Sequence, residues 1–269
     1  MTLITLPRSN FAGGARGHIC GPEQAPTILL LHGVGLALEA WTPQIDALCS
    51  SYRVLAIDLP GHGESAHLAG GDSLSDYVHW AASVVDAHGQ GPVSVVGHSM
   101  GALIALGLAV ERPDLIQRVA LLNVVYQRSD AARQAVLARA AQISEGNSDP
   151  TAPLSRWFEE QEHGQSAYQL TSALLHNADV AGYAAAYRGF AGGDQIYAQQ
   201  LDKVQCPLLA LTADGDVNST PAMAEAIAAG VRDGQAVVIE GHKHMLNLTA
   251  PEAVNSELLR WMERCNEID

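Results

Sequence analysis

The chain has 269 residues, a length that suits one large α/β domain or one domain with a substantial insertion. Hydrophobic residues make up 48% of the chain and charged residues 16%, a composition typical of globular rather than disordered proteins. The formal net charge is −14 with only 15 Lys and Arg, which argues against a nucleic-acid partner because phosphate contacts need clustered basic residues.

Four cysteines are spread along the chain without a CxxC motif or a paired spacing: Cys20, Cys49, Cys206 and Cys265. This scatter predicts free thiols and a cytoplasmic protein. The first residues show no basic segment followed by an apolar run, so we expect no signal peptide. No apolar run reaches the roughly 18–20 residues that a membrane span needs, so we expect no span.

Short apolar runs, each followed by a turn signal, predict about eight strands. The central runs are apolar without a polar alternation, a pattern typical of parallel strands covered on both faces. The runs occupy residues 3–6, 17–20, 27–33, 53–61, 92–99, 118–123, 207–215 and 236–241.

Helical patterns lie between these runs. Residues 72–89 place apolar side chains on one helical face, and Ser73 and Asp76 have the spacing of an N-terminal cap. Near the end of the chain, Thr249 and Glu252 have the spacing of a capping box. The alternation of strands and helices predicts a mostly parallel, doubly wound sheet.

Residues 127–200 interrupt this alternation. No strand run appears there, and four helical pieces at 129–146, 154–164, 166–178 and 179–190 are separated by turn residues. We interpret this region as a helical insertion into a core domain formed by residues 1–126 and 201–269.

The sequence Gly-His-Ser-Met-Gly at 97–101 matches the G-x-S-x-G pattern, in which a sharp strand-to-helix turn exposes a serine. An apolar strand run precedes it and a helical run follows it, which is the context that the pattern requires. A backbone turn of this kind costs about 1–3 kcal/mol, so it tends to persist where it serves a function. The pattern predicts that Ser99 is a nucleophile.

A serine needs a base to accept its proton and an acid to orient that base. The acids Asp214 and Asp216 follow one strand run, and the histidines His242 and His244 follow another. The members of each pair are two residues apart, so strand parity does not choose between them. The chain order Ser, Asp, His is the order that one particular fold uses.

These motifs together resemble the α/β-hydrolase superfamily, and specifically its small esterase, lactonase and cofactor-free perhydrolase-like members. The matching segments occur in family order over nearly the whole chain: 29–35, 56–65, 95–101, 212–221 and 241–252. The resemblance implies an α/β-hydrolase fold with an eight-stranded, mostly parallel sheet, flanking helices and an inserted helical lid at 127–200.

The resemblance also assigns roles to residues. It implies that Asp216, ahead of a helix-starting proline, is the acid, and that His244, three residues before an Asn-Leu pair, is the base. It implies that the backbone N–H groups of Val34 and Met100 bind the oxyanion. Ala213 and Lys243 stand where the family commonly has glycine, so Asp214 and His242 stay open as alternatives.

Several other residues have competing interpretations. Arg128, Arg156 and Arg188 lie in or beside the insertion, where one of them would pair with a substrate carboxylate or all would be surface residues. His32 is expected to brace its loop rather than to react, and His98 is expected to be packed under the loops. Five aromatic residues of this region are candidate pocket walls or packing residues: Tyr126, Trp157, Phe158, Tyr183 and Tyr187.

The sequence predicts a serine hydrolase that cleaves a small carboxylic ester, lactone or related acyl compound through an acyl-enzyme. The 11 histidines include no HxxxH or HExxH pair, so we expect neither a metal nor a cofactor. Hydrolysis of a C–C bond or an amide, and perhydrolysis, remain alternatives, as does a ligand receptor that retains the triad with little turnover. The expected partner is a small acyl substrate, and a homodimer stays open.

Overall fold

A computed structural model describes residues 5–69, 71–146, 149, 151–162 and 165–264. Its sheet has eight strands in the order β1-β2-β4-β3-β5-β6-β7-β8. The pairs β1–β2 and β2–β4 are antiparallel, and every other neighbouring pair is parallel. The strands are β1 (Ser9–Asn10), β2 (Arg16–Cys20), β3 (Thr27–Leu31), β4 (Arg53–Ile57), β5 (Val93–His98), β6 (Ile116–Leu122), β7 (Leu208–Ala213) and β8 (Gly234–Ile239).

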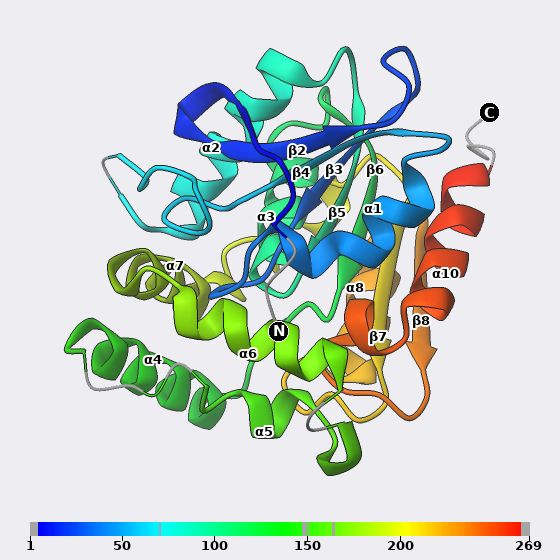
Figure 1. Cartoon of the computed structure of the whole chain (residues 1–269). Helices are drawn as coiled ribbons and strands as arrows, with labels where there is room; N and C mark the ends of the chain where they lie inside the picture. Colours follow the sequence, from blue (N-terminus) through cyan, green and yellow to red (C-terminus); the bar gives the residue numbers. More distant parts are fainter. Residues whose placement is uncertain (1–4, 70, 147–148, 150, 163–164, 265–269) are drawn as a thin grey trace.

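Helices cover both faces of this sheet (Figure 1). Alternate residues of the central strands enter two different cores: Leu29 and Leu31 pack with α2 (Leu74–His88), α3 (Met100–Glu111) and α8 (Pro221–Gly230). Ile28 and Leu30 pack on the other side, with α1 (Thr42–Leu48) and α10 (Pro251–Glu263). Because both faces of the central strands are buried, these strands are mainly apolar without alternation, as the sequence predicted.

The region between β6 and β7 is helical. It contains α4 (Asp130–Ser144), α5 (Leu154–Trp157), α6 (Ser166–Asn177) and α7 (Val180–Gly193). Figure 1 shows these helices gathered at one edge of the sheet, beyond the carboxyl ends of the parallel strands. Short 3-10 helices complete the chain: η1 (Ala12–Gly14), η2 (Leu38–Trp41), η3 (Glu160–Glu162) and η4 (Leu201–Lys203), together with the single α-helical turn α9 (Leu246–Thr249).

The sequence predictions for single elements had mixed outcomes. The cap of α2 is confirmed, because Ser73 and Asp76 form a reciprocal capping box. The predicted capping box at the last helix is wrong: α10 begins after Ala250, and the Thr249 hydroxyl instead bonds to Nδ1 of His242 at 3.0 Å. The first predicted strand, 3–6, lies partly outside the described residues, and the first strand of the structure is β1.

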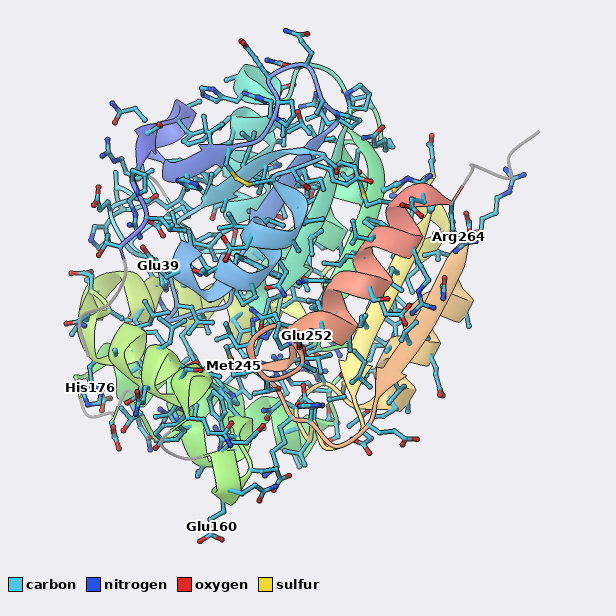
Figure 2. The ribbon with its side chains drawn as sticks, turned by 45° about the vertical axis from the view of Figure 1, so that its right-hand side comes forward. Glu39, Glu160, His176, Met245, Glu252 and Arg264 are labelled. Atoms are coloured by element: carbon cyan, nitrogen blue, oxygen red, sulfur yellow. A yellow bond between two sulfur atoms is a disulfide. The ribbon has the colours of Figure 1, made fainter. Side chains whose placement is uncertain are left out.

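The prediction that all cysteines are free thiols is also wrong. Cys20 at the end of β2 and Cys49 after α1 form a disulfide with a Cα–Cα distance of 5.6 Å (Figure 2). The sheet brings them together because β2 pairs with β4, and α1 leads directly into β4. Their separation of 29 residues gives no local signal of this contact. Cys206 is a free, buried thiol, and Cys265 lies outside the described residues.

Within the part of the chain that the structure describes, no helix is both long and apolar enough to span a membrane.

Candidate functional site

The chain turns sharply at Ser99, between β5 and α3. Ser99 has φ 54° and ψ −112°, a backbone conformation that residues other than glycine rarely adopt. Its N–H donates to the Leu122 carbonyl at 2.9 Å, and its carbonyl accepts the Ala102 N–H at 3.0 Å. The turn is therefore fixed by β6 on one side and by the first turn of α3 on the other.

The two glycines that flank Ser99 are required by close backbone contacts. A Cβ atom at Gly97 would lie 2.1 Å from the Gly101 carbonyl oxygen. A Cβ atom at Gly101 would lie 2.1 Å from the Leu31 carbonyl oxygen of β3. Side chains at either position would force the elbow apart, which gives the G-x-S-x-G pattern its physical reason.

Ser99, His244 and Asp216 lie together at the carboxyl ends of the parallel strands. Nε2 of His244 lies 3.1 Å from Oγ of Ser99, and Nδ1 of His244 lies 2.8 Å from Oδ2 of Asp216. Only 5%, 3% and 2% of Ser99, His244 and Asp216 are exposed. With the imidazole proton on Nδ1, Nε2 is free to accept the serine proton, which is the geometry of a nucleophile, a base and an orienting acid.

The carboxylate of Asp216 is held by three further donors. The Asn123 amide donates to Oδ2 at 2.8 Å, and the N–H groups of Asn218 and Ser219 donate to Oδ1 at 2.8 and 3.1 Å. Burial alone raises the pKa of Asp216, but His244 and these hydrogen bonds lower it, and the net shift is downward. Asp216 therefore stays ionised and faces His244 as an anion.

The alternative acid and base lie elsewhere. Asp214 is exposed and accepts the Gly241 N–H at 2.8 Å, which closes the turn after β8. His242 bonds to the Thr249 hydroxyl. Neither side chain bonds to Ser99, whereas His244 bonds to Ser99 and Asp216 at once.

His98 contacts the residue that carries the candidate base, His244. Its Nε2 donates to the backbone carbonyl of His244 at 2.8 Å, and it also packs edge-on against Trp41. Burial, with a smaller effect of His244, lowers the pKa of His98 to about 3, so the ring is neutral and its proton is on Nε2. The expectation that His98 is packed under the loops agrees with its burial and with these contacts.

The loop after β3 lies beside Ser99 and contains Val34. The Gly33 carbonyl accepts hydrogen bonds from Nδ1 of His32 at 2.7 Å and from the Leu36 N–H at 3.2 Å. In a trans peptide the N–H points away from the carbonyl, so the Val34 N–H is directed opposite to the His32 ring. Met100 opens α3, where the first N–H groups have no acceptor within the helix. These are the two N–H groups to which the family resemblance gives an oxyanion role.

A cavity of about 480 Å³ opens beside Ser99 and His244. One side comes from the core and the other from the inserted helices. It is lined by Val34, Ser99, Val125, Arg128, Ser129, Ala132, Ala135, Val136, Arg139, Pro153, Arg156, Trp157, Tyr187, Phe190, Val217, Asn218, Met223 and His244.

Three arginines line the same cavity as Ser99, and they differ in their partners. Arg128 is neutralised by Asp194 at 3.0 Å and stacks on Phe190 with its guanidinium carbon 4.4 Å from the ring centroid. Arg139 donates to the Asp149 carbonyl, but its buried Nε has no partner among the described residues. No ion pair of Arg156 with another described residue is found.

Of the other residues that the sequence suggested for the cavity, Arg188 and the five aromatic residues, only some line it. Arg188 does not line the cavity, because it pairs with Asp72 at 2.5 Å near the surface. Trp157 and Tyr187 line the cavity. Tyr126, Phe158 and Tyr183 are not among the lining residues and pack into the two adjoining hydrophobic clusters.

Sequence reasoning missed two residues of the site. Asn123 ends the predicted strand 118–123, and a strand-terminal asparagine with φ 49° is a usable signal only once the backbone is known. Arg139 belongs to a helical run rich in alanine, and nothing in that run indicates which face lies over the serine. Among the described residues, no group of three or more His, Cys, Asp or Glu side chains is arranged to hold a metal ion.

Residues 28–257 match the model of the alpha/beta hydrolase family. The chain belongs to this family. In this alpha/beta hydrolase, Ser99, Asp216 and His244 lie on segments that follow β5, β7 and β8.

This alpha/beta hydrolase is similar to two curated proteins and one solved structure that illustrate its relationships within the family. The (E)-2-((N-methylformamido)methylene)succinate hydrolase of Acinetobacter baylyi is 45% identical over 259 residues, which cover 96% of this chain and 97% of the relative. The 3-oxoadipate enol-lactonase 1 of the same organism is 27% identical over 237 residues, with 87% of both chains covered. The enol-lactonase of Burkholderia xenovorans has the same fold, with a TM-score of 0.84, 24% identity, and 96% of this chain and 100% of that chain covered.

Proposed function

We propose that this hydrolase cleaves an acyl bond of a small dicarboxylic acid by covalent catalysis at Ser99. The observation that carries the proposal is the charge of the cavity. The chain has a net charge of −14, yet Arg128, Arg139 and Arg156 line the cavity and none of its described lining residues is acidic. A cationic cavity in an acidic protein favours an anionic ligand.

Arg139 and Arg156 are the two arginines that we assign to substrate carboxylates. Arg128 already has Asp194 as its counter-ion, whereas Arg139 and Arg156 lack a carboxylate partner among the described residues. A guanidinium group binds a carboxylate through two parallel hydrogen bonds. Two such groups in one cavity suit a substrate with two carboxylates, and the Acinetobacter relative is named for a substituted succinate.

The reaction begins when His244 takes the hydroxyl proton of Ser99 as Oγ attacks the acyl carbon. The N–H groups of Val34 and Met100 stabilise the negative charge that forms on the acyl oxygen. The tetrahedral intermediate collapses to an acyl-serine, and His244 returns the proton to the leaving group. Water then attacks the acyl-serine with His244 as the base, and the acid is released. Asp216 orients the imidazole and stabilises its charged form.

We further propose that residues 127–200 act as a lid. Trp157 of α5 lies over His244, and the cavity side of α4 contributes Arg139, so these helices would exclude water and bind substrate together. The core domain would then comprise residues 1–126 and 201–269. The same arrangement makes the substrate class depend on the insertion and the chemistry depend on the core.

The first compound to test is (E)-2-((N-methylformamido)methylene)succinate, beside its dimethyl ester and an uncharged ester such as p-nitrophenyl acetate. Turnover of the dicarboxylate with formate release supports hydrolysis of an amide by this chain. Selective turnover of a dicarboxylic enol ester or enol lactone instead supports the ester and lactone reading. Ser99→Ala should abolish every one of these activities while the protein stays folded.

The arginine assignment has its own test. Arg139→Met and Arg156→Met should each raise KM for the dicarboxylate by about tenfold or more, because a substrate carboxylate loses one charged hydrogen-bond partner. Both variants should turn over p-nitrophenyl acetate at nearly the wild-type rate. Arg188→Met is the matched control on the same insertion, and its KM should not change. Equal KM values in all three variants would refute the assignment.

A ligand receptor with the same residues is the alternative from another class. Binding of the dicarboxylate without turnover, in a protein whose Ser99 reacts with a fluorophosphonate, would favour it. Steady turnover excludes it.

A further inference from the structure

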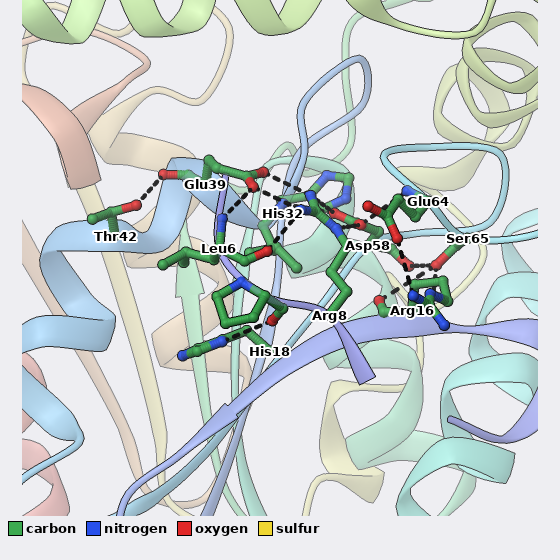
Figure 3. A network of polar contacts seen from close by, with 12 residues as sticks. Leu6, Arg8, Arg16, His18, His32, Glu39, Thr42, Asp58, Glu64 and Ser65 are labelled. Carbon is green, nitrogen blue, oxygen red and sulfur yellow. Dashed lines mark hydrogen bonds and ion pairs between the residues drawn. The ribbon is translucent and has the colours of Figure 1, made fainter. Parts of the chain in front are cut away.

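A buried ion-pair network joins the N-terminal segment to the loop that follows β3 (Figure 3). The Arg8 guanidinium donates to both carboxylate oxygens of Glu39 at 2.8 Å and to Oδ2 of Asp58 at 2.6 Å. The side chains of Arg8 and Glu39 are each 5% exposed, and that of Asp58 is fully buried. One cation therefore serves two buried carboxylates.

The two carboxylates also accept hydrogen bonds from backbone N–H groups. Oδ1 of Asp58 accepts the Leu38 N–H at 2.9 Å at the start of η2, and Oδ2 accepts the Glu64 N–H at 3.1 Å. Glu39 itself lies in η2 and accepts the Leu6 N–H at 3.2 Å. The end of the loop is thus held by Asp58 and by the N-terminal segment.

The beginning of the same loop is held by two histidines. His32 bonds to the Gly33 carbonyl and accepts the Leu59 N–H at 2.9 Å. His62 accepts the Gly35 N–H at 2.9 Å. Val34 lies between the Gly33 carbonyl and the Gly35 N–H, both of which are held by hydrogen bonds. The Gly33–Val34 peptide therefore keeps one orientation only while the loop keeps its position relative to β4 and the segment that follows it.

Arg8 is the cation on which this register depends. Without it, Glu39 and Asp58 would face each other as two buried carboxylates with no compensating charge, which is strongly unfavourable. One of them would take up a proton or turn away, and the hydrogen bond from Leu38 to Asp58 would weaken. The loop would then lose its fixed end, four residues from Val34.

We propose that Arg8 is a positioning residue for the oxyanion site, holding the Val34 N–H in place through Glu39 and Asp58. The proposal rests on the proposed function, in which the Val34 N–H stabilises the transition state. It makes the N-terminal segment part of what the active site needs, although none of the described residues of that segment lines the cavity.

The test compares Arg8→Met and Arg8→Lys with Arg112→Met. Arg112 is a matched control, because it also bonds two carboxylates, Asp86 and Asp114, but on an exposed surface remote from the loop. For p-nitrophenyl acetate, Arg8→Met should lower kcat by about 10- to 100-fold with KM little changed, as expected for loss of an oxyanion contact. Arg8→Lys should restore part of kcat, and Arg112→Met should leave it unchanged.

Hydrogen–deuterium exchange provides a readout that needs no substrate. The amides of residues 33–39 should exchange faster in Arg8→Met than in the wild type, while those of α10 should not. Glu39→Gln, which keeps the shape but removes one charge, serves if Arg8→Met fails to fold, and it should also speed exchange in residues 33–39.

The outcomes separate the two proposals. If no variant changes exchange in residues 33–39, or if Arg8→Lys loses as much kcat as Arg8→Met while both are stable, the role of Arg8 is refuted. If the wild type fails to hydrolyse any acyl compound, the proposed function fails, and the exchange data alone then decide whether Arg8 fixes the loop.

Discussion

The indole ring of Trp157 lies against the imidazole ring of His244, with ring centroids 5.4 Å apart and ring planes inclined by 32°. Trp157 belongs to α5, which lies between β6 and β7, and His244 follows β8. Met245, the residue after His244, is fully buried in a cluster with Leu154 and Trp157. Met245 marks this junction in Figure 2. The inserted helices therefore contact the candidate base directly.

Replacement of Trp157 should affect the base more than substrate binding. His244 becomes a cation in the transition state, and an aromatic face stabilises a cation by about 0.5–2 kcal/mol. Trp157→Leu should therefore lower kcat by about 3- to 30-fold, and Trp157→Phe should lower it less. Steady-state kinetics on p-nitrophenyl acetate measures this. Equal losses in the Leu and Phe variants would show that ring volume, not the aromatic face, is what His244 needs.

Asn123 gives a prediction about the acid. Its amide is one of the donors that keep Asp216 ionised, and its backbone has φ 49°. Asn123→Gly removes the hydrogen bond but accepts this φ, whereas Asn123→Ala removes the bond and adds about 1 kcal/mol of backbone strain. Both variants should lose about 10- to 100-fold in kcat, as for one hydrogen bond to a charged group. Only Asn123→Ala should also lose the additional stability, which urea unfolding measures.

The sequence contained much of this architecture. The unbroken apolar runs predicted a parallel sheet buried on both faces, and the fold is confirmed. The sharp turn at Ser99 was predictable because its two glycines, the preceding strand and the following helix are local features. Asp216 and His244 needed the family resemblance, since Asp214 and His242 satisfy the same strand parity, and only tertiary geometry separates the members of each pair.

The remaining features depend on contacts between distant segments. Arg8 meets Glu39 and Asp58 across 31 and 50 residues, and neither spacing has a sequence signature. The disulfide between Cys20 and Cys49 likewise follows from the register of β2 with β4. The direction of Arg139 into the cavity is set by how α4 packs on α7, which the weakly amphipathic sequence of α4 does not specify.

The lowered pKa values of three buried histidines predict how the free energy of unfolding depends on pH. Burial lowers the pKa of His32 to about 4 and, with repulsion from His32, that of His62 to about 3. Burial with His244 lowers that of His98 to about 3. Unfolded histidines titrate near pH 6.5, so below that pH the unfolded chain binds protons that the folded chain does not. Stability should therefore be full above about pH 7 and fall as the pH decreases toward 4.

Urea unfolding between pH 7 and pH 4.5 tests this expectation. Each histidine should contribute on the order of 1 kcal/mol per pH unit to the slope once the pH lies below its unfolded value. His62→Gln keeps an acceptor for the Gly35 N–H and removes one titrating group, so its slope should be about a third smaller than that of the wild type. A wild-type stability that stays constant from pH 7 to pH 4.5 would contradict buried neutral histidines.

His98 allows the position of the base to be tested apart from its chemistry. Nε2 of His98 donates to the His244 carbonyl, and Nδ1 is buried without a partner among the described residues. The side-chain amide of His98→Gln can still donate a hydrogen bond to that carbonyl, whereas the side chain of His98→Leu cannot. Loss of this hydrogen bond should lower kcat by about tenfold in His98→Leu, because a displaced imidazole no longer lies along the line from Asp216 to Ser99.

The comparison between the two His98 variants decides the interpretation. His98→Gln should retain most of kcat, and both variants should react with a fluorophosphonate at Ser99 in proportion to their kcat. A structural role alone would lower the melting temperature of His98→Leu without changing kcat below that temperature. If both variants lose kcat equally, the ring itself is needed, through its contact with the His244 ring at 5.1 Å, rather than the hydrogen bond to the carbonyl.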